Sequence, residues 1–231
     1  MEGFRIEIEY RNRKTLGIKL EESGRIRVLA PKGTSFSVIK EALGAKEKWI
    51  LNKLREIEGQ EKPSPIEFGG TVPFLGTDLA IRPFDHDKGR INKTRISKGE
   101  LLIGSRDWSR DKLKDAMVDF YRANTREIAI ERIDLYWRSI GIKPEGITVR
   151  DQKTRWASCS SRGNLSFNLR CSMLPMELFD YIVIHELCHL IHMDHSMEFW
   201  KRVEAILPDY NDRKKRLKNE GASIFRYFRK E

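Results

Sequence analysis

The stretch Tyr181-Ile-Val-Ile-His-Glu-Leu-Cys-His-Leu-Ile-His-Met-Asp-His195 contains the pattern His-Glu-x-x-His, formed by His185, Glu186 and His189. On a helix, residues four apart lie on the same face, about one turn apart. Two imidazoles placed in this way can bind one metal ion, and the glutamate between them can act as a base. The pattern therefore predicts a helix that binds a metal.

The residues around the pattern favour a metal site over ordinary helical histidines. Four of the five histidines in the chain fall within these fifteen residues. The other positions of the helix are apolar on nearly every face, which is typical of a helix in a protein core. A glutamate buried there needs a hydrogen-bond partner or an opposite charge. A bound cation would supply that charge.

A catalytic zinc site commonly has three protein ligands and a fourth position for water. The candidates for the third ligand are His192 and His195. On an unbroken helix His192 would lie ~10 Å along the axis from His185, too far for both to bind one ion unless the helix were sharply distorted. His195 comes after a point where the chain can leave the helix and turn back. We therefore expect His185, His189 and His195 to bind Zn²⁺, with the spacing of the metzincin motif.

The metal stretch and the segment His195-Ser-x-x-Phe-Trp200 resemble the YgjP-like metallopeptidase family, which is also described as predicted metal-dependent hydrolases. The similarity to SprT and WLM protease domains is more distant. The segment from Arg155 to Asn168 resembles a second signature of the family, with Ala157 where a glycine is expected, and the segment from Arg13 to Trp49 resembles its N-terminal part. The resemblance implies hydrolysis of peptide bonds.

The expected fold class is α+β, in two parts. Short alternating runs in residues 1–107 predict an N-terminal β-rich accessory region with small antiparallel sheets and a helix. Residues 108–231 would form a zincin-like catalytic domain with a long helix ended by Gly141, a short sheet and the His-Glu-x-x-His helix. In that sheet we expect residues 164–170 to form an exposed edge strand with one polar, solvated face.

Composition narrows the class of protein further. The net charge of +10 suits nucleotides or nucleic acid, but acidic residues are interspersed with the basic ones, so we do not favour nucleic acid as the partner. No apolar run reaches the ~18 residues of a membrane span. The three cysteines, Cys159, Cys171 and Cys188, form no Cys-x-x-Cys pair, so we expect them to be reduced. We therefore expect a cytoplasmic monomer that does not bind membranes.

The predicted mechanism is metal-assisted hydrolysis. Zinc would lower the pKa of its water to about 7, and Glu186 would take the proton of that water as general base. A second group should stabilise the oxyanion, and Arg155, Asn168 and His192 are candidates among which the sequence does not choose. An extended polypeptide substrate would lie along the strand at 164–170.

Three other functions are compatible with the same residues. A nucleotide pyrophosphatase acting on nucleoside triphosphates could use the same zinc and water, although the sequence has no glycine-rich phosphate loop. A SprT-like protease could act on DNA-bound proteins, although no zinc finger follows the metal helix. A metal-stabilised binding module would need no turnover. Glu186 argues against this last function, because a structural zinc needs no base beside it.

Overall fold

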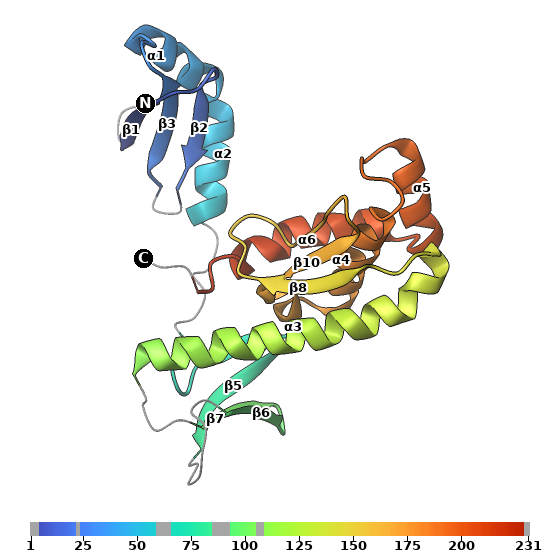
Figure 1. Ribbon diagram of the computed structural model, residues 1–231. Coiled ribbons are helices and arrows are strands. Elements are labelled where there is room, and N and C mark those ends of the chain that lie inside the picture. The colour runs from blue at the N-terminus through green and yellow to red at the C-terminus, as the bar shows by residue number, and fades with distance from the viewer. Residues whose placement is uncertain (1–4, 22–23, 59–65, 85–92, 105–108, 229–231) are drawn as a thin grey trace. The chain divides into compact units, whose positions relative to one another are not determined.

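The computed structural model (Figure 1) describes residues 5–21, 24–58, 66–84, 93–104 and 109–228. Contacts between Cα atoms divide the chain into two compact units, residues 1–61 and 62–231. The predicted division between an accessory region and a catalytic domain, at residues 107 and 108, lies outside the described residues and stays a prediction.

The first unit is a three-stranded sheet packed on two helices. The strand order is β1-β3-β2, with β1 (Ile6–Arg11) parallel and β2 (Gly17–Leu20) antiparallel to β3 (Ile26–Pro31). The helices are α1 (Phe36–Ala45) and α2 (Glu47–Glu58). The prediction of a purely antiparallel sheet is therefore wrong for β1, which is parallel to β3. Parallel and antiparallel strands show the same alternation of apolar residues, so the sequence could not distinguish them. The structure has two helices, α1 and α2, where the sequence predicted one, and Lys46 separates them.

The core of the first unit is small and apolar. Its buried residues come from the central strand and from both helices: Ile26, Val28, Ala30, Ile39, Leu43, Ile50 and Leu54. Because alternate residues of β3 supply three of them, one face of this sheet is covered by the helices.

The second unit begins with a four-stranded sheet in the order β4-β5-β7-β6. Strand β5 (Thr77–Phe84) is parallel to β7 (Glu100–Gly104) and antiparallel to β4 (Thr71–Phe74), while β6 (Lys93–Ser97) is antiparallel to β7. The buried side chains of this sheet belong to the same apolar core as the helices that follow.

The long helix α3 (Arg110–Ile140) connects the parts of the second unit (Figure 1). It ends as predicted at Gly141, whose φ of 95° is left-handed and whose N–H donates to the Trp137 carbonyl. Arg132 of α3 binds Asp180 through two hydrogen bonds of 2.6 and 2.8 Å. This paired contact joins α3 to the helix that carries the histidines.

The second sheet of this unit has three strands. Strand β10 (Asn164–Asn168) lies in the centre, parallel to β8 (Gly146–Arg150) and antiparallel to β9 (Ala157–Cys159). The prediction that this strand is an exposed edge is therefore wrong. The strand also ends at Asn168, because a short 3₁₀ helix, η1 (Leu169–Met173), begins there.

Three helices complete the chain: α4 (Met176–Cys188), α5 (Met197–Ile206) and α6 (Tyr210–Ile224). Helix α4 is buried on nearly all sides and contacts α3, α5, α6 and β9. The α+β class is thus confirmed, with small sheets and a buried histidine-bearing helix. All three cysteines are free, as predicted. In the described part of the chain, no helix combines the length and apolar character needed to cross a bilayer.

Candidate metal centre

The end of helix α4 places the first two histidines of the motif. His185 lies in the last turn, and the helix ends at Cys188, so that His189 is the first residue after it. The ring Nδ1 of His189 lies 2.9 Å from the His192 carbonyl oxygen. A carbonyl can only accept, so Nδ1 carries the hydrogen and Nε2 keeps a free lone pair. The turn after α4 therefore orients His189 as a metal ligand would be oriented.

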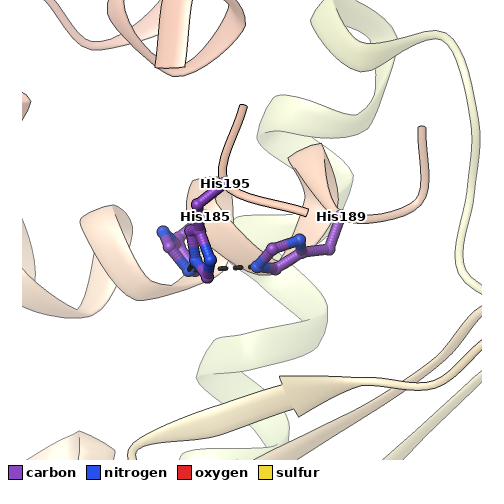
Figure 2. Close-up of side chains that lie close together, drawn as sticks. All are labelled: His185, His189 and His195. Carbon is purple, nitrogen blue, oxygen red and sulfur yellow. Dashed lines mark hydrogen bonds between the residues drawn. The ribbon is translucent and has the colours of Figure 1, made fainter. Parts of the chain in front are cut away.

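Three ring nitrogens converge beside the end of α4 (Figure 2). The Nε2 atom of His185 lies 3.2 Å from Nε2 of His189 and 3.1 Å from Nε2 of His195, and the three ligand atoms lie within 4.8 Å of one another. Two nitrogens bound tetrahedrally to one zinc at 2.0–2.1 Å lie about 3.3 Å apart. The separation of the ring nitrogens therefore fits a shared ion.

The charge state of these histidines also suits metal binding. Burial lowers the pKa of His185 to about 3, with smaller contributions from His189, His195 and Lys214. Burial likewise lowers the pKa of His189. Both imidazoles are therefore neutral at neutral pH, with lone pairs available to a cation.

Glu186 is buried beside the histidines, with 6% of its surface exposed. Its Oε2 atom has no hydrogen-bond partner among the described residues, and the same is true of Nδ1 of His185. Burial raises the pKa of Glu186 to about 8, and the charge of Arg155 opposes this rise. A divalent cation near the carboxylate would favour its charged form. The unpartnered oxygen of this buried carboxylate therefore fits a site that could bind a cation.

Two aromatic residues of α5 hold the histidine rings in place. Phe199 is fully buried, and its ring centroid lies 4.5 Å from that of His189, 4.9 Å from that of His195 and 5.0 Å from that of His185. Trp200 stacks on His195 with an interplanar angle of 26°. Sequence reasoning missed this contact, for which the one signal was that the two aromatics follow His195 by four and five residues.

His192 is not one of the converging histidines. It lines a hollow of about 390 Å³, together with Ser139, Glu198, Lys201, Arg202, Ala205 and Ile206. Only its backbone carbonyl contributes to the metal centre, through the hydrogen bond to His189.

Asn168, predicted to lie on a solvated face, is fully buried instead. Its Nδ2 donates to the carbonyls of Gln152 at 2.7 Å and Arg155 at 2.9 Å, while its Oδ1 accepts from the Arg170 N–H at 3.1 Å. These bonds leave no donor of Asn168 available for a substrate. They hold the loop that carries the exposed residue Arg155, whose positive charge lowers the pKa of Glu186.

Arg170 was also predicted to lie on the solvated face, and it is buried, with 3% exposed. Its guanidinium pairs with Asp151 at 2.5 Å and donates to the Tyr227 carbonyl at 2.6 and 3.0 Å. The 3₁₀ helix that follows β10 turns the residue inward, which strand alternation could not show. Arg170 thus joins the loop before β9 to the segment after α6.

Comparison with known proteins supports a metallopeptidase class for this chain. The metallopeptidase domain of the YgjP-like family matches residues 14–220. No match was found among curated proteins. Among solved structures, the chain is similar to the crystal structure of the metallopeptidase zymogen of Pyrococcus abyssi abylysin, with 24% identity and a TM-score of 0.36. That similarity covers 42% of this chain and 93% of the other.

Proposed function

This chain belongs to the YgjP-like metallopeptidase family, and we propose that it is a zinc-dependent peptidase in which His185, His189 and His195 hold the ion and Glu186 is the general base. The observation that carries the proposal is the convergence of three Nε2 atoms beside a buried carboxylate with an unpartnered oxygen. Three imidazole donors with a fourth position left for water are typical of catalytic zinc.

Glu186 is placed to move a proton. Zinc held by the three histidines would supply Lewis acidity and would lower the pKa of a water molecule to about 7. The Oε2 atom of Glu186 has no protein partner to compete for it among the described residues. It can accept the proton of the attacking water and then donate it to the leaving amine nitrogen.

Strand β9 is the edge that we propose for the substrate, in place of the central strand β10. The Trp156 carbonyl accepts from Asn168 on the β10 side, so the backbone groups of Ala157 and Cys159 point to the other side. No described strand pairs with that side. Because β9 contacts α4, an extended peptide added along it would pass close to the histidines.

The test compares wild-type protein with Glu186→Gln, and with Glu204→Gln as a control at an exposed glutamate of α5. Each is assayed for zinc content and against casein, a peptide pool and nucleoside triphosphates. We expect Glu186→Gln to retain zinc and to lose peptide hydrolysis by ~10²–10⁴-fold, while Glu204→Gln behaves as wild type.

Two results would assign a different function. Hydrolysis of triphosphates without cleavage of any peptide would make the protein a nucleotide pyrophosphatase. In a second assay, with a DNA-binding protein in the presence and absence of DNA, cleavage only of the DNA-bound form would assign the activity of a SprT-like protease. Wild-type peptide turnover by Glu186→Gln would remove Glu186 from the mechanism.

A further inference from the structure

Lys214 of helix α6 approaches the metal centre through an aromatic stack. Its Nζ lies 4.0 Å from the ring centroid of Trp200. Trp200 in turn lies 5.6 Å from His195 and 5.8 Å from His185, measured between ring centroids. Tyr210, one turn before Lys214 on α6, stacks on the same indole at 5.3 Å. The ammonium group is thus held against the ring that supports a metal-binding histidine.

Lys214 differs from the basic residues next to it on α6. Arg213 pairs with Asp209 at 2.9 Å, Lys215 pairs with Asp212 at 3.2 Å, and Arg216 pairs with Glu220 at 2.8 Å. Among the residues that the structure describes, Lys214 pairs with no carboxylate. Its side chain is exposed, so its positive charge remains available to a ligand.

We propose that Lys214 binds a carboxylate of the peptide substrate, so that the enzyme prefers peptides with a carboxylate close to the cleaved bond. This inference rests on the proposed peptidase function. The carboxylate can be the free C-terminus of a short peptide or the side chain of an aspartate or glutamate, which present the same chemistry to an ammonium group.

Three physical effects support this role. A hydrogen bond between two charged groups is stronger than one between neutral groups. Contact with the indole face restricts the lysine side chain before the substrate binds, so less conformational entropy is lost on binding. A cation bound by the histidines adds a second positive charge nearby, which attracts anions and disfavours cationic side chains at the same position.

A purely structural role for Lys214 makes different predictions. If the lysine only packs on Trp200 and so supports His195, its removal should lower zinc content or kcat equally for every peptide. A residue that binds a substrate carboxylate should instead change KM, and only for peptides that carry the carboxylate.

The experiment uses a peptide that the zinc-loaded wild-type protein cleaves, prepared in matched forms. One form has a free C-terminus, one is amidated, and one has each acidic side chain replaced by its amide. The variants are Lys214→Ala, Lys214→Arg, Lys214→Glu and the control Lys218→Ala, which removes another exposed lysine of α6. Binding of fluorescent peptides is measured separately on the Glu186→Gln background.

We expect Lys214→Ala to raise KM and peptide Kd by ~10-fold for forms that carry the carboxylate, which corresponds to about 1.4 kcal/mol. For the form that lacks the recognised carboxylate, KM and Kd should change little. Lys214→Arg should retain the preference for peptides with the carboxylate. Lys214→Glu should shift the preference toward peptides with lysine in place of the carboxylate-bearing residue, and Lys218→Ala should match wild type. The form whose neutralisation removes the effect identifies the source of the carboxylate.

Two outcomes would overturn the inference, and they are distinguishable. If the wild type cleaves peptides but all forms respond equally to every Lys214 variant, the carboxylate site is wrong and the peptidase function stands. If neither wild type nor Glu186→Gln cleaves or binds any peptide, the proposed function fails and this inference fails with it.

Discussion

Replacement of Phe199 by alanine should weaken zinc binding as well as stability. The ring is fully buried and lies 4.5–5.0 Å from all three imidazoles. Truncation of a buried phenylalanine costs ~3–5 kcal/mol, through lost burial and the cavity that remains. The cavity would also let the three rings adopt other orientations, and loss of a group that orients ligands commonly lowers metal affinity by ~10–100-fold. We expect both effects.

The matched control is Phe167→Ala in strand β10. Phe167 is equally buried, but its aromatic contact is Phe179 at 6.2 Å rather than a histidine. Urea unfolding of the metal-free proteins should show similar destabilisation for both variants. Competition with a zinc chelator should then show weaker affinity only for Phe199→Ala. Equal zinc affinity in the two variants would refute the idea that Phe199 orients the ligands.

Further predictions concern individual residues. His195→Ala should lose zinc far more readily than His192→Ala in metal analysis after dialysis, and the reverse order would move the third ligand to His192. Arg170→Met should lower the free energy of unfolding by ~2–3 kcal/mol, below the value for a fully buried pair because Asp151 is half exposed. Burial raises the pKa of the Cys171 thiol, so the native state keeps it neutral while the unfolded state ionises. Stability measured by urea unfolding should therefore fall from about pH 8 to about pH 10, and it should fall less in Cys171→Ala.

The clustering of His185, His189 and His195 could be predicted from the sequence because these residues are close together in the chain. His185 and His189 share one helical face, and the distance argument against His192 depends only on helix geometry. The structure agrees with that argument, since His195 joins the cluster and His192 does not. Helix α3 was also predictable, because its apolar spacing and the glycine after it are local signals.

The strand at 164–168 shows where local patterns are insufficient. Its alternation predicts two faces correctly, but an edge strand and a central strand have the same alternation when the partner strands are unknown. Asn168 and Arg170 are polar, and polarity alone suggested exposure. Both are buried because each finds several hydrogen-bond partners in segments distant in sequence.

This division between local and distant contributions applies to function as well. The proposed ligands and base, together with Phe199 and Trp200, come from one short segment, so the hydrolytic chemistry can be recognised from that segment alone. The groups that we propose to contact the substrate come from elsewhere, since Lys214 lies on α6 and β9 precedes the histidine-bearing helix α4. A family can therefore keep the metal segment while changing those surrounding elements and thus its substrates. For this reason, substitutions at Lys214 should alter which peptides are cleaved, whereas substitutions within the segment should alter whether any peptide is cleaved.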